Sequence, residues 1–187
     1  MGMIAIIGGI GSGKSSVLQH ISDLGKRTCD CDEIYRQISK EQEFIDFVGK
    51  TFGVVEDGEI NKKALGKIIF NDGEQLKKLN GIAHPLVFGR LEEIFRGGEG
   101  DMYVEVSAFD KSMVDKFDAI IYVKTQKQNQ IQRVKLRNGW EEDYITSVIA
   151  KQMSAEEMES VADFVIVNDG DIQHLLEQVE WIIGWMQ

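Results

Sequence analysis

The sequence predicts an α/β protein built on a doubly wound, five-stranded parallel sheet, and two observations lead to this fold class. The apolar run 3–7 ends at Gly8 and Gly9, and a helical pattern follows over residues 16–24. A strand that is apolar throughout is typical of a parallel sheet covered on both faces. Further short strands alternate with helical patterns and are expected at residues 27–31, 102–106, 119–123 and 164–167.

Two helical stretches interrupt this alternation. Residues from about 34 to 99 carry almost only helical patterns, which predicts a helical insertion after the second strand. Within it, Pro85 is expected to break a helix. Residues from about 126 to 159 form a second, partly basic helical stretch, which predicts a lid. The core of this single domain then consists of residues 1–33, 100–125 and 160–187.

Composition and charge describe an ordinary globular chain. The 187 residues are 43% hydrophobic and 28% charged, and the formal net charge of -10 argues against a nucleic-acid partner. An anionic substrate therefore needs a local cluster of Lys, Arg and backbone N–H groups. No apolar run approaches the ~18 to 20 residues that span a bilayer, so we expect no membrane contact and a cytoplasmic location. Cys29 and Cys31 are too few for a zinc site or a disulfide framework.

Residues 8–15 read GGIGSGKS and fit the phosphate-binding pattern GxxxxGK[ST]. The glycines let backbone N–H groups turn inward around phosphate oxygens, Lys14 reaches the terminal phosphates, and the Ser15 hydroxyl coordinates Mg²⁺. The helix that follows adds its positive N-terminal end. The alternative is a glycine-rich turn with a solvated lysine. The residues expected to bind the ATP phosphates are Gly9, Ile10, Gly11, Ser12, Gly13, Lys14, Ser15 and Ser16.

Three carboxylates are candidates for the chemistry near this loop. Asp30 and Asp32 alternate across Cys31 at the end of the second strand, so both should project from one face at the carboxyl edge of the sheet. One of them could accept the proton of an attacking hydroxyl, and the alternative is that one caps the next helix. Glu105 lies on an apolar strand and suits a magnesium ligand that acts through water, with a structural salt bridge as the alternative.

Two arginines and one histidine are candidates for substrate contacts. Arg133 and Arg137 stand four residues apart on a predicted helix, hence on one side of it. They could close over the transferring phosphoryl group, where a positioned arginine accelerates transfer by ~10³ or more. The alternative is a solvated helix face. His84 is a candidate substrate contact, with a structural histidine as the alternative.

Several separated blocks of the sequence resemble the dephospho-coenzyme A kinase family, in the family's order and over nearly the whole chain. The family's glycine loop appears as GGIGSGKSS at residues 8–16, and its Asp-x-Asp strand end with a following arginine appears at residues 30–36. The further blocks are the substrate-side helices with their His-Pro pair, the lid and the adenine-side loop, at residues 57–87, 130–140, 150–153, 162–163 and 168–170.

The resemblance implies a three-layer P-loop kinase fold with a helical insertion on the CoA side and a helical lid. It implies an enzyme that uses ATP with Mg²⁺ to phosphorylate the 3′-hydroxyl of dephospho-coenzyme A, and we expect it to be a monomer. Asp32 is then the base, and Lys14 and Arg137 act at the transferring phosphoryl group. The residues expected near the acceptor substrate are Asp32, Arg36, His84 and Arg133, and those near the adenine are Asn168 and Gly170.

The chain departs from the family at two places. Ile7 stands where the family commonly has threonine before the glycine loop. Residues 107–110 read SAFD where the family has a Pro-Leu-Leu-aromatic-Glu segment, and they are apparently one residue shorter. ATP binding is unaffected by these changes, but they leave open a related kinase for another small-molecule hydroxyl or for a nucleoside monophosphate.

Two other classes of nucleotide-binding protein are less favoured. A GTP-hydrolysing switch needs an Asn-Lys-x-Asp element to read the base, and the nearest string, at residues 61–64, reads NKKA and lacks the aspartate. A nucleotide-binding regulator without catalysis is disfavoured because Lys14, Ser15 and Asp32 are all present.

Overall fold

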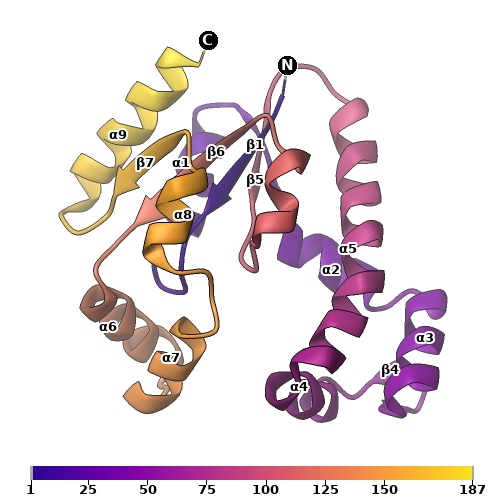
Figure 1. The fold of residues 1–187 in the computed structure, drawn as a ribbon. Coiled ribbons are helices and arrows are strands. Elements are labelled where there is room, and N and C mark those ends of the chain that lie inside the picture. The colour runs from indigo at the N-terminus through magenta and orange to yellow at the C-terminus, as the bar shows by residue number, and fades with distance from the viewer. Residues whose placement is uncertain (1, 187) are drawn as a thin grey trace. The chain divides into compact units, whose positions relative to one another are not determined.

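The computed structural model describes residues 2–186, apart from the side chain of Asn71. The chain divides into two compact units (Figure 1). The first, called the sheet unit below, comprises Met1–Asp30 and Glu99–Gln187, and the second, the helical unit, comprises Cys31–Gly98. No helix among the described residues is both long and apolar enough to cross a membrane.

Five parallel strands form the sheet, which confirms the predicted fold class. In the order in which they lie side by side, they are β2 (Arg27–Asp30), β5 (Met102–Glu105), β1 (Met3–Ile7), β6 (Ala119–Lys124) and β7 (Phe164–Val167). The central strand β1 is buried between β5 and β6, as its continuous apolar run requires. Because all five strands are parallel, their carboxyl ends meet at one edge, where ligands bind in sheets of this kind.

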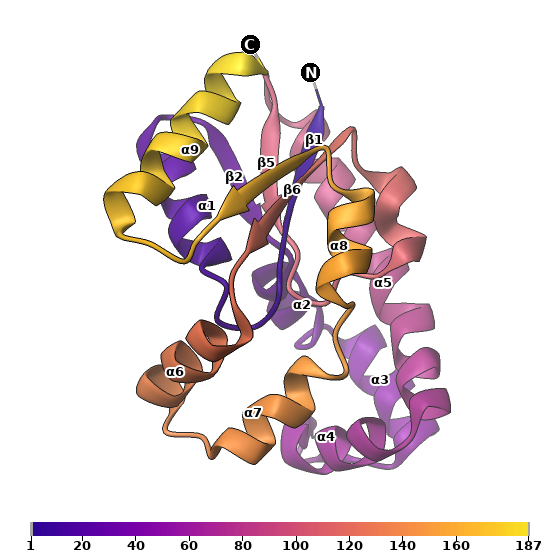
Figure 2. The ribbon, with the colours of Figure 1, turned by 60° about the vertical axis from the view of Figure 1, so that its left-hand side comes forward.

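Helices cover both faces of the sheet and make three layers (Figure 2). Helices α1 (Lys14–Asp23) and α9 (Ile172–Trp185) contact each other over one face, and α8 (Ala155–Val161) lies on the other face against β6. Apolar side chains fill the space between the sheet and the α1–α9 pair, and each contributes about 1.5–3 kcal/mol when fully buried. They include Ile4, Ile6, Val17, Ile21, Val123, Ile166, Leu175 and Val179.

Carboxylates hold the starting ends of two strands. The N–H of Met3 donates to Oδ2 of Asp118 over 2.7 Å, and the N–H of Ile120 donates to Oδ2 of Asp163 over 2.8 Å. These backbone donors stand at positions where neighbouring strands begin, so a side chain supplies the acceptor.

At the edge of the sheet, a side chain takes the place of a further strand beside β7. Gln178 on α9 accepts the N–H of Val167 at Oε1 and donates from Nε2 to the carbonyl oxygen of Val167, both over 2.9 Å. Between β5 and β6 the chain forms a short 3-10 helix, η1 (Lys111–Lys116), and between β6 and α8 it forms α6 (Lys127–Asn138) and α7 (Glu142–Ile149), which contact each other.

The helical unit consists of four helices and a two-stranded antiparallel pair that the sequence did not predict. The helices are α2 (Cys31–Ile38), α3 (Gln42–Phe52), α4 (Lys62–Asn71) and α5 (Gly73–Arg96), and the strands are β3 (Val55–Glu56) and β4 (Glu59–Ile60). Both α2 and α4 pack against α5, which contributes the buried side chains Leu79, Ala83, Val87 and Leu91.

Helix α5 continues through Pro85, so the predicted break at this residue is wrong. A proline inside a helix removes the hydrogen bond to the carbonyl four residues earlier. That carbonyl belongs to Gly81, and both residues are exposed, so water can replace the missing donor. The buried residues Ala83 and Val87 keep the helix packed on both sides of the proline.

Candidate active site

The loop between β1 and α1 passes through backbone conformations that glycine adopts readily and other residues do not. Gly11 has a φ of 73° and Gly13 a φ of 100°. A Cβ on Gly13 would lie 2.2 Å from Nδ2 of Asn168, and a Cβ on Gly11 would lie 2.8 Å from the carbonyl oxygen of Gln130. Both positions therefore require glycine for two reasons, the backbone conformation and the close neighbours.

This loop leads into the N-terminus of α1, where an anion is favoured. Gly13 takes the N-cap position, and no side chain caps the helix there. The positive end of the helix dipole suits phosphate. Lys14 is buried, and its Nζ donates to the carbonyl oxygens of Gly8 (3.0 Å) and Gly9 (3.2 Å). Its ammonium group thus lies over the same loop.

A hydroxyl and a carboxylate meet beside the loop. Oγ of Ser15 donates to Oε1 of Glu105 over 3.1 Å, and Glu105 is only 6% exposed at the C-terminal end of β5. Its register partner on β2 is Asp30. Within residues 2–186, no three or more His, Cys, Asp or Glu side chains are grouped so that they could hold a metal ion. The arrangement fits a cation that takes few protein ligands and keeps water and phosphate oxygens, as Mg²⁺ does.

Two side chains from distant parts of the chain brace the loop from outside. Nδ2 of the buried Asn168 donates to the carbonyl oxygen of Ser12 over 2.7 Å. Arg133 on α6 donates from Nη2 to the carbonyl oxygen of Asn168 over 2.9 Å, and from Nη1 to the carbonyl oxygens of Gly11 and Ser12, each over 3.4 Å. The guanidinium group therefore ties the loop to the segment after β7. The substrate role of Arg133 and the adenine role of Asn168 stay predictions.

Asp169 belongs to the same neighbourhood, although the sequence did not single it out. Its Oδ1 accepts hydrogen bonds from Oγ1 of Thr125 (2.7 Å), the N–H of Gln126 (2.8 Å) and Nδ2 of Asn129 (3.0 Å). Burial alone raises the pKa of Asp169, but these hydrogen bonds outweigh it and hold the pKa below its ordinary value. The ionised carboxylate fastens the segment after β7 to the start of α6. Gly170, expected near the adenine, comes next and is exposed.

Two glutamines, one on α6 and one just after α7, contact the loop. A Cβ on Gly9 would lie 2.2 Å from Nε2 of Gln130, which is buried on α6. Oε1 of Gln152, which follows α7, accepts the N–H of Ile10 over 2.8 Å. In the sequence, Gln152 belongs to a segment that resembles the family, residues 150–153, and Gln130 was given no role. Neither contact with the loop could be predicted, because a contact between distant residues leaves no local pattern in the sequence.

The structure separates the two arginines that the sequence placed on one side of α6. The Arg133 side chain reaches the glycine loop, as described above. Arg137 is exposed in the last turn of α6, and its Nε donates to Oδ1 of the adjacent Asn138 over 2.8 Å. Its catalytic role stays a prediction.

Asp32 lies in the helical unit. Strand β2 ends at Asp30 and α2 begins at Cys31, so the expected alternation of Asp30 and Asp32 along one strand is wrong. The helix starts directly after the strand, and the acidic side chains Asp32 and Glu33 in its first turn favour this start because they face the positive end of the helix dipole. Asp32 therefore projects from a helix N-terminus.

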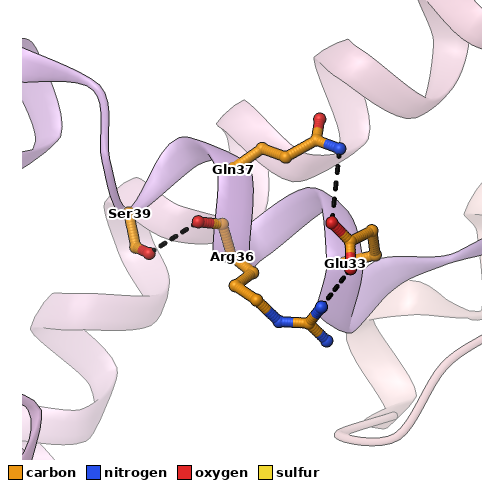
Figure 3. Close-up of polar contacts among 4 residues, drawn as sticks. All are labelled: Glu33, Arg36, Gln37 and Ser39. Atoms are coloured by element: carbon orange, nitrogen blue, oxygen red, sulfur yellow. Dashed lines mark hydrogen bonds and ion pairs between the residues drawn. The ribbon is translucent and has the colours of Figure 1, made fainter.

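Arg36 and His84, both expected near the acceptor, also lie in the helical unit. The guanidinium group of Arg36 forms an ion pair with Glu33 one turn earlier (Figure 3). Nε2 of Gln37 reaches the same carboxylate over 3.5 Å, and Oγ of Ser39 donates to the carbonyl oxygen of Arg36 over 2.9 Å. The pair is exposed and contributes only about 0–1 kcal/mol, so a stronger anion could replace Glu33. His84 is half-buried on α5.

The segment that departs from the family leads into η1. Oδ1 of Asp110 accepts the N–H of Ser112 over 2.7 Å and so caps η1. Nζ of Lys111 forms an ion pair with Glu157 on α8 over 2.8 Å. Lys111 and the N–H of Ser154 lower the pKa of Glu157 to about 2. These contacts fasten the segment after β5 to α8.

Comparison with known proteins identifies the family. The family model described as dephospho-CoA kinase matches residues 2–174, which is nearly the whole chain. The chain belongs to the dephospho-CoA kinase family. It is therefore a phosphotransferase, and the resemblance found in the glycine loop and the separated blocks is confirmed.

Relatives of this dephospho-CoA kinase family member match it over almost their full length. The chain is 35% identical to the dephospho-CoA kinase of Carboxydothermus hydrogenoformans over 191 aligned residues, covering 97% of this chain and 92% of the relative. The crystal structure of TT1252 from Thermus thermophilus has a TM-score of 0.88 at 25% identity and covers 99% of this chain and 97% of that one. Dephospho-CoA kinase from Campylobacter jejuni has a TM-score of 0.71 at 22% identity over 98% and 96% of the two chains, which supports the predicted P-loop kinase fold.

Proposed function

We propose that the protein transfers the γ-phosphoryl group of ATP to the 3′-hydroxyl of dephospho-CoA, giving coenzyme A and ADP. The observation that carries this proposal is the glycine loop at the start of α1, where the buried Lys14 ammonium and the Ser15–Glu105 pair lie together, in a chain of the dephospho-CoA kinase family. A phosphate cradle, a cation and a metal-binding pair at the carboxyl edge of a parallel sheet are the parts that phosphoryl transfer needs.

On the ATP side, the backbone N–H groups of residues 9–16 and the helix N-terminus hold the phosphates. Lys14 exchanges the carbonyl oxygens of Gly8 and Gly9 for phosphate oxygens and stabilises the charge of the transferring group. Ser15 and, through water, Glu105 would hold Mg²⁺, which neutralises phosphate charge when bound. Asn168 and Gly170 are proposed to lie near the adenine.

On the acceptor side, Asp32 is proposed as the base. Its carboxylate takes the proton of the 3′-hydroxyl, the oxygen forms a bond to the γ-phosphorus, and the bond from that phosphorus to the β,γ-bridging oxygen breaks as ADP leaves. The first turn of α2, directly after the carboxyl end of β2, supports this assignment of Asp32. Arg137 is proposed to contact the transferring group, and Arg36, His84 and Arg133 the acceptor. A cytoplasmic monomer stays a prediction of the sequence.

A panel of acceptors tests the proposal. The purified protein is incubated with Mg²⁺ and ATP, together with dephospho-CoA, a nucleoside monophosphate or another small alcohol, and ADP and the phosphorylated product are quantified. We expect equimolar ADP and coenzyme A with dephospho-CoA, little product with the other acceptors, and none with the Lys14→Ala variant. Phosphorylation of another acceptor but not of dephospho-CoA would contradict the proposal, and equal use of GTP and ATP would reopen the question of the donor.

A further inference from the structure

An open groove lies on the sheet unit, away from the glycine loop. Its volume is about 1100 Å³, and it is lined by the start of β6, the first half of β7 and one side of α9. Strand β7 is at the edge of the sheet, and α9 runs beside it (Figures 1 and 2). Parallel strands all start at the edge opposite their carboxyl ends, so the groove and the site proposed for phosphoryl transfer lie at opposite edges of the sheet.

Two tryptophans of α9 expose large apolar surfaces at this groove. Trp181 is 67% exposed and Trp185 is 69% exposed, and both line the groove. They stand four residues apart, hence on one side of the helix. The ring of Trp185 packs edge-on against the ring of Phe164, with centroids 5.3 Å apart, which holds it in place. Exposed apolar surface gathered at one hollow is typical of a binding surface, and tryptophans are frequent among the residues that dominate binding at protein interfaces.

The charged side chains around the groove have one sign. Asp118, Asp163 and Glu177 line it, and among the described residues no Lys or Arg does. The carboxylates of Asp118 and Asp163 are held in place, because Oδ2 of each accepts a backbone N–H, from Met3 and Ile120 respectively. The faces of the indole rings also attract cations. The groove is therefore complementary to a partner that carries Lys or Arg beside apolar side chains.

The size and charge of the groove argue against three other occupants. Its volume exceeds the range of about 300–1,000 Å³ that is typical of small-molecule pockets. Two copies of the chain that met here about a two-fold axis would place the same carboxylates against each other, which is repulsive. The anionic headgroups of a bilayer surface would be repelled in the same way. A basic segment of another protein meets none of these objections.

We propose that this groove binds a segment of another protein that carries lysine or arginine beside apolar side chains, with Trp181 and Trp185 as the main contacts. The apolar side chains of the partner pack on the two indole rings, and its cations lie against the carboxylates and the aromatic faces. Because the groove and the glycine loop lie at opposite edges of the sheet, the partner leaves the loop open. The proposal is independent of the phosphoryl transfer proposed above.

A library of random dodecapeptides displayed on phage and selected on the immobilised full-length protein tests the proposal. We expect the selected peptides to be enriched in Lys and Arg beside aromatic or aliphatic residues. Fluorescence anisotropy with the labelled peptides then measures the Kd. Trp181→Ala should raise this Kd at least about 10-fold, as for a central tryptophan of an interface. Glu177→Lys should also raise it, and so should an increase in NaCl from about 0.05 to about 0.5 M, because salt screens the charges.

Matched variants separate the groove from the rest of the surface. Ile172→Ala removes a side chain that is 60% exposed on the same helix but outside the groove, and Glu156→Lys makes the same charge change on α8. Both should leave the Kd unchanged, and thermal unfolding of every variant shows that it is folded; if Trp181→Ala is not, Glu177→Lys carries the test. The proposal is overturned if no peptide is selected, if the peptides lack basic residues, or if they bind both groove variants as tightly as the parent. Self-association of the parent in sedimentation velocity that Trp181→Ala abolishes would assign the groove to a second copy and overturn it as well.

Discussion

Replacing Gly13 with alanine tests how tightly the glycine loop is packed. Its φ of 100° lies in the left-handed region, where an L side chain costs about 1–2 kcal/mol. The new Cβ would also lie 2.2 Å from Nδ2 of Asn168, so the hydrogen bond from that amide to the carbonyl oxygen of Ser12 must break. Leaving buried polar groups unpaired costs about 1–3 kcal/mol. The free energy of unfolding should therefore fall by about 2–5 kcal/mol, the sum of the two effects.

Gly25→Ala is the matched control, just beyond the other end of α1. Gly25 has a φ of 75°, but an added Cβ there would meet no atom within 4 Å, so only the backbone cost of about 1–2 kcal/mol is expected. Urea unfolding of the two variants gives the difference, and Gly13→Ala in an Asn168→Ala background measures the contribution of the contact. Equal losses in Gly13→Ala and Gly25→Ala, or the same effect of Gly13→Ala with and without Asn168, would refute the argument.

Three further predictions concern charge. Lys14→Ala should lower kcat at least about 10³-fold, because it removes several kcal/mol of charge stabilisation, and steady-state assay of ADP release measures this. Asp32→Asn should reduce kcat far more than ATP affinity; if it turns over like the parent, Asp30 becomes the candidate base. Because its pKa is lowered to about 2, Glu157 contributes stability that is present above its ordinary pKa of 4.5 and is lost as the pH falls toward 2. Lys111→Met should raise this pKa toward 4.5, as NMR titration of the carboxyl group can show, and an unchanged pKa would mean that Lys111 is not the cause.

The sheet and the glycine loop could be predicted from the sequence because their signals are local. The apolar run of β1 and the glycines after it occupy consecutive positions, and burial on both faces leaves a run without alternation. The strand expected at residues 27–31 ends one residue earlier, at Asp30, and Cys31 is the first residue of α2. The sequence could not separate the two elements here, because the same residue types are allowed at the end of a strand and at the start of a helix. The break expected at Pro85 was wrong because packing of its buried neighbours on α5 outweighs the loss of one exposed hydrogen bond.

The contacts that surround the loop could not be predicted from the sequence. Arg133 and Gln152 reach the loop from 121 and 142 positions away, and their spacing along the chain carries no sign of what they touch. Asp169 likewise has partners that lie about 40 residues earlier. Side chains that bind backbone atoms of a distant segment depend on the tertiary fold, so they become visible only when that fold is known.

The amide of Gln178 imitates one peptide unit of a strand that the sheet does not have. By offering a donor and an acceptor to Val167, it uses the backbone groups that an extended segment from another molecule would need. Val165 and Val167 are partly exposed on this edge strand. An edge strand with exposed apolar side chains and unpaired backbone groups can pair with a strand of another molecule. We therefore expect Gln178 to make the C-terminal end of this edge strand less available for pairing with a strand of another molecule.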